Sequence, residues 1–223
     1  MAFQIETKDC TSLSDSELSE LADLCMEGRG GFDIGYLSKQ REEWVLVTQV
    51  REGAKLRGFS FSTLERIGGT PSILLGLAQM TRTSKADATL KAIMGEQFRR
   101  ALLAFPDEDV LVGVRIVDPV GFQVLSGLSE VVPRPGHRAT GEERAWGRRL
   151  AKRFKAEGQI DDRSFVLTGD GSTFGFVDFV SSRTDTVEPE VEAFFGSIDC
   201  GRGDCLVAFG WAMAEDLAAG RLP

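Results

Sequence analysis

Two apolar runs, each followed directly by the start of a helix, constrain the fold of this chain more than any other part of its sequence. The first run covers residues 73–80, and a long segment follows in which apolar residues recur every three or four positions, at Leu90, Ile93, Met94, Phe98, Ala101, Leu102 and Phe105. The second run, residues 110–116, enters another helix through Asp118 and Pro119. Neighbouring parallel strands need a helical crossover, so this order predicts a parallel βα unit.

The composition is that of an ordinary globular chain of 223 residues, with 42% hydrophobic and 27% charged residues, and we expect one domain with an appendage. The net charge of −8 gives no support for nucleic-acid binding, and no apolar stretch approaches the roughly 18 residues of a membrane span. The first residues lack a signal-peptide pattern, and four cysteines are too few for a disulfide scaffold, so we expect a cytoplasmic protein. A single histidine, His137, excludes a His-rich metal site, and we expect no metal.

The rest of the sequence predicts a mixed α/β chain. The elements expected outside the βα unit are a helix at 15–26, strands at 44–50 and 56–64, a helix at 141–156 that opens with the capping box Thr140-x-x-Glu143, strands at 163–168 and 174–180, and helices at 189–195 and 206–219. Gly169-Asp-Gly171, between the two late strands, has the residues of a hairpin turn.

This order of elements resembles the core of the GNAT superfamily of N-acyltransferases, which use acyl-CoA. The resemblance covers roughly Asp15 to Glu130 and includes the strand Gly58-Phe-Ser-Phe61 after a hairpin. It implies an α/β (α+β) fold with a mixed, mostly antiparallel central sheet, one splayed parallel strand pair and flanking helices. We expect residues 1–186 to form the GNAT-like domain and residues 187–223 a C-terminal helical extension packed on it.

The resemblance also implies where the acyl donor binds. In GNAT enzymes the pantetheine arm enters the gap between the fourth and fifth strands, which places backbone groups of Leu77, Ala78 and Met80 along it. The pyrophosphate sits at the start of the next helix, where unpaired N–H groups attract anions, and the residues there are Arg82, Thr83, Ser84 and Lys85. Arg82 matches the first position of the family's loop, whereas Lys85 and Asp87 replace its two small residues.

The second helix of the unit departs from the family as well. Asp118 stands where many GNAT enzymes have Asn, and we assign it to the donor site. Leu125 stands where they have the Tyr that protonates the leaving thiolate, and the chain's one tyrosine, Tyr36, is distant in sequence. Ser126 is the neighbouring hydroxyl that can reach the sulfur. For the proton on the amine, the candidates are Glu65 as a base and Gln79 acting through water.

A basic helix and an apolar C-terminal segment suggest partners. Seven basic residues stand against two glutamates between Arg138 and Lys155, which is either a solvated helix face or, over Arg144–Lys155, a surface for an acidic acyl carrier protein. The segment from Val187 carries four large aromatic residues and either covers the cleft or pairs two subunits as a homodimer.

Three interpretations fit the sequence. The first, which we favour, is an N-acyltransferase that moves an acyl group from acetyl-CoA, another acyl-CoA or a carrier-bound thioester to an amine of a small molecule or protein. The second is a catalytically inactive GNAT-fold binding or assembly module, and the third is an unrelated α/β protein. The topology of the sheet separates the third interpretation from the other two.

Overall fold

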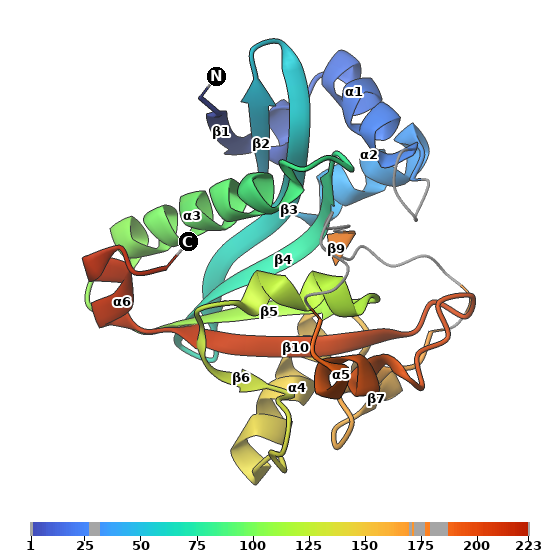
Figure 1. The fold of residues 1–223 in the computed structure, drawn as a ribbon, viewed down its shortest axis with the longest axis vertical. Helices are drawn as coiled ribbons and strands as arrows, with labels where there is room; N and C mark the ends of the chain where they lie inside the picture. The colour runs from blue at the N-terminus through green and yellow to red at the C-terminus, as the bar shows by residue number, and fades with distance from the viewer. Residues whose placement is uncertain (1, 27–31, 170, 172–176, 179–186, 223) are drawn as a thin grey trace.

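A computed structural model of the chain describes residues 2–26, 32–169, 171, 177–178 and 187–222. Its centre is a single twisted sheet with helices on both faces (Figure 1). In the described part of the chain, no helix is both long and apolar enough to cross a membrane.

The described strands join into one sheet in the order β1-β2-β3-β4-β9-β5-β10-β8-β7, with β6 paired to β10. The strands are β1 (Gln4–Asp9), β2 (Leu46–Glu52), β3 (Lys55–Ile67), β4 (Thr70–Met80), β5 (Val110–Ile116), β6 (Ser129–Val132), β7 (Ile160–Asp161), β8 (Val166–Leu167), β9 (Val177–Asp178) and β10 (Cys205–Ala212). Strands β1 to β4 are antiparallel neighbours, and β4 runs parallel to β5. The predicted fold class, a mostly antiparallel sheet with one splayed parallel pair, is therefore confirmed.

Helices cover both faces of the sheet. The helical segments are η1 (Cys10–Ser12), α1 (Asp15–Met26), α2 (Ile34–Glu43), α3 (Ala86–Ala104), η2 (Pro119–Leu125), α4 (Gly141–Arg153), η3 (Glu157–Gln159), α5 (Pro189–Glu192), η5 (Ala193–Phe195) and α6 (Ala214–Ala219). Helix α3 reaches the sheet through Gln97, which accepts a hydrogen bond from Ser62, the partner of Leu75 in β4. Helix α4 packs Leu150 against Gly113, beside Leu74. Leu74 and Leu75 are adjacent in β4, so their side chains point to opposite faces of the sheet. Helix α4 lies on the Leu74 face and helix α3 on the Leu75 face.

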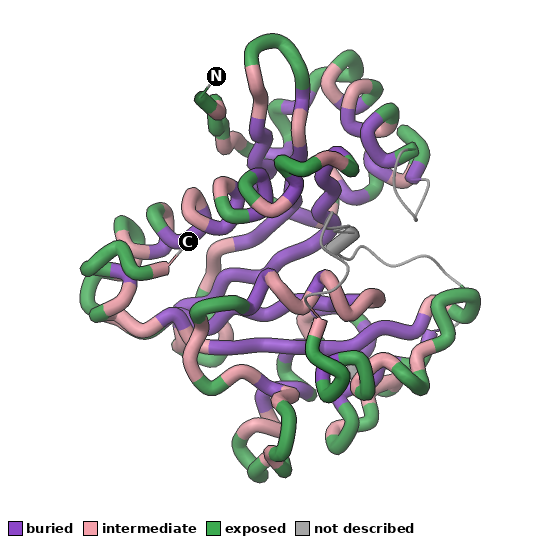
Figure 2. Tube along the Cα trace, viewed as in Figure 1, coloured by how far each residue is buried: buried purple, intermediate pink, exposed green. Residues whose placement is uncertain are grey.

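The buried strands explain the apolar runs that the sequence carries. Every residue of β5 is buried, and so are the last ten residues of β4, because helices or loops cover both of their faces (Figure 2). The predicted stripe on α3 faces the sheet, with Ile93, Met94 and Phe98 all at most 5% exposed. Helix α4 begins with the predicted capping box, in which Thr140 and Glu143 exchange hydrogen bonds. The core is thus centred on the β4–β5 pair.

Three sequence predictions were wrong in the later part of the chain. The helix expected at 206–219 is strand β10 followed by the short helix α6, and β10 pairs antiparallel with β5 along Leu206–Ala212. The expected hairpin around Gly169 does not form, because β8 pairs with β7 and β10 whereas β9 pairs with β4 and β5. The segment after Asp118 is a 3₁₀ helix of seven residues, not an α-helix.

The C-terminal segment is consequently part of the sheet. The helices expected at 189–195 are present as α5 and η5, but β10 contributes a central strand, so residues 187–223 are more than a helical extension. The domain boundary predicted at residue 186 lies outside the described residues.

Candidate functional site

The parallel strands β4 and β5 separate at one end of the sheet. They pair from Ser72 and Leu111 as far as Leu75 and Val114, and no further. At that point the pairing of β4 with β3 shifts by one residue, between the partners of Ser60 and Ser62. A bulge of this kind bends the strand that carries it, which accounts for the divergence of β4 from β5.

Strand β9 lies in the gap between the diverging strands (Figure 1). Its Val177 and Asp178 pair in parallel with Ala78 and Gln79 of β4, and Val177 also pairs with Ile116 of β5. Within the stretch of β4 that the sequence assigned to a pantetheine arm, Ala78 therefore has β3 on one edge and β9 on the other, and Met80 pairs with β3. A ligand that bonds to this edge of β4 competes with the chain's own strand.

The loop before α3 has most of its turn hydrogen bonds satisfied internally. Thr83 Oγ1 accepts a hydrogen bond from the N–H of Lys85 at 3.3 Å, and the carbonyl of Thr83 accepts one from the N–H of Ala86 at 3.0 Å. The predicted phosphate-binding residues Arg82, Ser84 and Lys85 are exposed around this turn. Helix α3 then begins at Ala86 without a side-chain cap, which leaves N–H donors of its first turn available to a ligand.

The charges at this helix start largely cancel. The ammonium of Lys85 is ion-paired with Glu52 on β2, and the same carboxylate binds Arg57 at 2.6 Å. Hydrogen bonds from Lys85 and Arg57 lower the pKa of Glu52, so it is ionised at neutral pH. Asp87 adds a second carboxylate, and its Oδ1 is buried without a hydrogen bond among the described residues. The turn before α3 therefore carries one net positive charge, from three basic residues (Arg57, Arg82 and Lys85) and two acidic residues (Glu52 and Asp87).

A groove of about 350 Å³ runs between α3 and η2. Its α3 wall includes Asp87, Leu90, Lys91 and Met94, and its η2 wall includes Gln123 and Ser126, with Arg221 closing one side. The predicted catalytic Ser126 is exposed and lines this groove. The structure therefore brings Ser126 to the same cavity as the first turn of α3.

Two predicted catalytic residues lie apart from each other. Glu65 pairs with Ser72 at the closed end of β4, seven residues and roughly 23 Å along the strand from Gln79. Its carboxylate is ion-paired with Arg153 of α4, with Oε1 2.5 Å from Nε, which leaves it a structural role at that position. Gln79 lies at the open end, where its Nε2 donates to the carbonyl of Met80 at 3.0 Å and its buried Oε1 has no hydrogen bond among the described residues.

Asp118 caps η2. Its Oδ1 accepts a hydrogen bond from the N–H of Val120 at 2.9 Å, and Pro119 follows it as the first helical residue. Leu125, at the position of the family's tyrosine, is 2% exposed. Asp118 thus positions η2 beside the groove, and its assignment to the donor site stays a prediction.

The fold brings a residue pair to the open end of the sheet that the sequence did not suggest. Arg115 lies in β5 at the point where the strand changes partner. The residue before it, Val114, is the last that pairs with β4, and the residue after it, Ile116, pairs with β9. Its side chain is 3% exposed, its guanidinium lies 4.8 Å from the ring centre of Phe154, and burial lowers its pKa. Tyr36 of α2 interacts electrostatically with Arg115, and burial raises the pKa of its phenol. Only the tertiary fold reveals this pairing of α2 with β5.

The basic helix α4 uses much of its charge within the protein. Arg148 is ion-paired with Asp162, Arg153 with Glu65, and Lys155 with Glu43 at 3.4 Å. Arg149 lies over the ring of Trp146, 4.7 Å from its centre. The helix also covers the face of the sheet opposite α3 and the groove, and a carrier protein at this helix stays a prediction.

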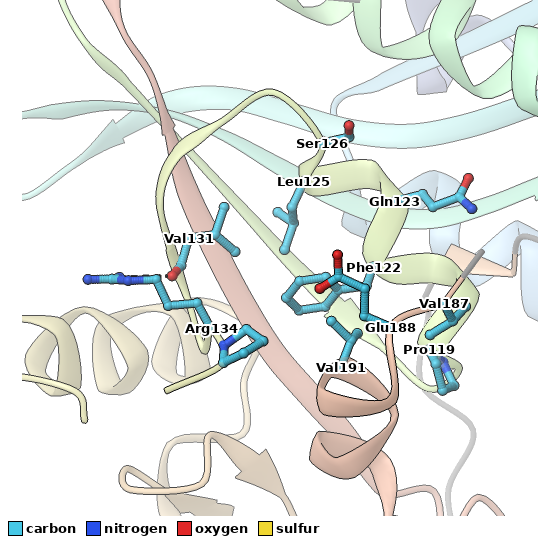
Figure 3. Close-up of a pocket in the computed structure, with 11 residues that line it drawn as sticks. Pro119, Phe122, Gln123, Leu125, Ser126, Val131, Arg134, Val187, Glu188 and Val191 are labelled. Carbon is cyan, nitrogen blue, oxygen red and sulfur yellow. Dashed lines mark hydrogen bonds between the residues drawn. The ribbon is translucent and has the colours of Figure 1, made fainter. Parts of the chain in front are cut away.

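A second cavity, of about 300 Å³, lies on the other side of η2 (Figure 3). Its walls come from η2, β6, the Pro-rich loop after β6 and the start of α5. Gln123 and Ser126 line both this pocket and the groove, so η2 separates two cavities that share an edge. In the described part of the chain, no group of three or more His, Cys, Asp or Glu residues is arranged to hold a metal ion.

Comparisons with known proteins match the chain to solved structures only. No family model matches the sequence, and neither does any curated protein sequence. The ribosomal-protein-S18-alanine N-acetyltransferase of Escherichia coli matches with a TM-score of 0.39 and 11% identity, over 62% of this chain and 86% of the enzyme. Escherichia coli ElaA matches with a TM-score of 0.36 and 13% identity, over 60% of this chain and 95% of ElaA.

A third match spans almost the whole chain. A Pyrococcus horikoshii protein assigned as an acetyltransferase has a TM-score of 0.39 and 11% identity, over 94% of this chain and 90% of that protein. At these TM-scores the matches carry no assignment of activity. The GNAT-like fold stands on the order of the strands and on the splayed parallel pair.

Proposed function

We propose that this chain is an N-acyltransferase that moves an acyl group from a pantetheine thioester to an amine. The observation that carries the proposal is the divergence of β4 from β5 after Leu75 and Val114, next to the groove between α3 and η2. An extended arm that contains amides can pair with this edge of β4 where it displaces β9 from Ala78 and Gln79. The groove lies between the first turns of α3, the helix after β4, and η2, the helix after β5. The matches to N-acetyltransferase structures agree with this activity without establishing it.

The reaction needs three proton transfers. The ammonium form of the acceptor first loses a proton, and the lone pair of the resulting amine then attacks the thioester carbonyl carbon, so that a C–N bond forms and the C–S bond breaks. The sulfur leaves with the bonding electrons and takes up a proton to become a thiol, while the nitrogen releases its extra proton to a base or to water. We assign the protonation of the sulfur to Ser126, and its position in the wall of the groove supports this assignment.

The weak net charge at the start of α3 bears on the choice of donor. Lys91 and Arg221 of the groove add two positive charges to the one net charge at this turn, so the cations and the unpaired N–H groups of the first turn can meet one phosphate or the several phosphates of coenzyme A. Both acyl-CoA and a carrier-bound phosphopantetheine thioester present the same pantetheine arm to β4. We therefore keep both as donors and test the free form first.

Calorimetry with acetyl-CoA and a longer acyl-CoA tests the proposal. We expect micromolar binding that weakens about tenfold in Lys85→Glu, because the substitution reverses a charge at the phosphate end. Lys152→Glu is the matched control, since it makes the same change on an exposed site of α4, on the opposite face of the sheet. Absence of heat with both thioesters, in a protein whose melting curve is cooperative, would exclude free acyl-CoA as the donor.

A catalytically inactive binding module is the second candidate, and β9 is the observation that favours it. A strand bonded to Ala78 and Gln79 closes the edge of β4 that a donor would use. Val177→Pro removes the N–H that β9 contributes at this position and weakens its pairing. An acyltransferase is expected to bind the thioester more tightly after this change, whereas an inactive module is expected to bind it neither before nor after.

A further inference from the structure

The pocket between η2 and α5 is mostly apolar, and its polar lining consists of Gln123, Ser126, Arg134 and Glu188. Five apolar side chains converge on it in Figure 3, namely those of Phe122, Leu125, Val131, Val187 and Val191. Leu125 and Val191 are buried, Phe122, Val131 and Val187 are half-buried, and Glu188 is exposed, so the pocket is a surface hollow with a packed apolar floor. Phe122 is further supported by Phe194 of η5, with ring centres 6.2 Å apart.

The two charged residues of the lining, Arg134 and Glu188, differ in whether their charged groups bind other protein groups. The guanidinium of Arg134 points away from the pocket (Figure 3), where it donates to the carbonyl of Val131 at 2.9 Å and to Glu143 at 3.1 Å. Glu188 directs its carboxylate toward the pocket and the ring of Phe122 in the same view. Within the described residues this carboxylate makes no hydrogen bond and no ion pair. The charge that the pocket offers to a ligand is therefore negative.

We infer that this pocket binds a small primary ammonium ion that carries an apolar body. The body fills the space between Phe122, Leu125 and Val191, and the ammonium faces the Glu188 carboxylate. An aromatic face next to a carboxylate also favours a cation through the ring quadrupole. A carboxylate ligand is repelled by Glu188, and a neutral ligand gains nothing from it.

The position of the pocket gives this ligand its role, which rests on the proposed function. Gln123 and Ser126 line both the pocket and the groove proposed for the thioester, so an amine bound in the pocket reaches the thioester along this shared edge and not through η2. The ligand is then the acceptor of the acyl group. Glu188 also supplies a base for the proton that the ammonium releases before its nitrogen attacks.

Binding of three matched probes tests the pocket in the absence of any thioester. Calorimetry of the full chain with hexylamine, hexanoate and hexanol at neutral pH compares one apolar body with three head groups. We expect saturable heat with hexylamine, at least tenfold weaker binding of hexanol, and no binding of hexanoate. Glu188→Gln is expected to weaken hexylamine binding about tenfold and to remove its advantage over hexanol.

The control variant separates the pocket from the general negative charge of the protein. Glu190→Gln removes a neighbouring exposed carboxylate of α5 that does not line the pocket, and binding of hexylamine should be unchanged. Equal affinity for the three probes, or an equal loss in Glu188→Gln and Glu190→Gln, would overturn the inference. Hexylamine binding that depends on Glu188 in a protein that binds no acyl-CoA would support the amine site and exclude free acyl-CoA as the donor.

Discussion

The two cavities beside η2 differ in how far the protein has already satisfied their polar groups. On the donor side, β9 occupies the edge of β4 at Ala78 and Gln79, and Glu52 neutralises Lys85. In the pocket, Arg134 is engaged outside the cavity, and Glu188 has no partner among the described residues. A donor must therefore displace β9 and compete with the Lys85–Glu52 pair, although N–H groups at the start of α3 are free to bind it. An amine in the pocket displaces no protein partner of Glu188 among the described residues.

The two cavities also differ in what holds them in place. The donor side is formed by the long strands β3 and β4 and the 19-residue helix α3. The pocket is walled by a seven-residue 3₁₀ helix, a four-residue strand and a four-residue α-helix. Short elements with few interior contacts open more readily, so we expect changes on the donor side to cost more stability than changes at the pocket.

The largest effect is expected at Gly58, where β3 meets α3 below the donor groove. A Cβ atom there would lie 2.7 Å from Thr89 Cγ2 and 3.0 Å from the carbonyl oxygen of Gln79. Gly58→Ala should lower the free energy of unfolding by about 2 kcal/mol, because backbone and helix must both shift. Chemical denaturation measures it, with Gly141→Ala as control, since a Cβ at Gly141 meets nothing within 4 Å. Equal stability of the two variants would contradict this packing.

The next effect concerns Glu143, which holds the loop on the pocket side. Burial opposes its ionisation, but hydrogen bonds from Thr140, His137 and Arg134 lower its pKa from 4.5 to about 2. A lowered pKa stabilises the fold above the unfolded value, and this stability is lost as the pH falls from about 4.5 toward 2. Glu143→Gln should therefore cost about 1–2 kcal/mol at pH 7, and the difference from the wild type should shrink below pH 4.

Urea denaturation at pH 7 and pH 3 measures this dependence. Glu142→Gln, on the adjacent exposed residue of α4, is the control and should show no such change. A Glu143→Gln difference that stays constant between the two pH values would show that its carboxylate adds no pH-linked stability.

A smaller effect is expected from Glu52, which neutralises the donor side. Glu52→Gln releases Lys85 and Arg57 from their shared carboxylate partner and raises the net positive charge near α3 from one to two. We expect acyl-CoA to bind about three- to tenfold more tightly, with the gain reduced in high salt because the charges are near the surface. Unchanged affinity in calorimetry at low salt would mean that the phosphates bind away from this pair.

The sequence predicted the βα unit and helix α4 well because their signals are local. The apolar runs of β4 and β5, the stripe on α3 and the capping box of α4 each lie within one segment, and the structure contains all four. The strand β10 was taken for a helix because all but one of its residues are buried, so neither alternation nor a helical period marks it.

The rest of the site depends on contacts that no local pattern carries. Glu65 looks like a free strand carboxylate until Arg153, 88 residues later, pairs with it. The pocket gathers residues from 119 to 191, and Glu188 has no motif around it. Tyr36 was set aside for its distance in sequence from the βα unit, yet the fold brings it within electrostatic reach of Arg115.

The smallest effect is expected at Tyr36. The sign of the change in the free energy of unfolding shows whether the Tyr36 hydroxyl, at the open end of the sheet, makes a stabilising hydrogen bond. The phenol oxygen is buried without a hydrogen bond among the described residues, and its ring stacks on Phe32 with centres 4.7 Å apart. Tyr36→Phe keeps the stacking and removes a polar group that gains nothing from burial, so the free energy of unfolding should stay equal or rise by about 0.5 kcal/mol. A loss above about 1 kcal/mol in chemical denaturation would mean that the hydroxyl has a partner. Because burial keeps this phenol protonated at neutral pH, a loss of acyl transfer without loss of stability would instead assign it a proton in the reaction.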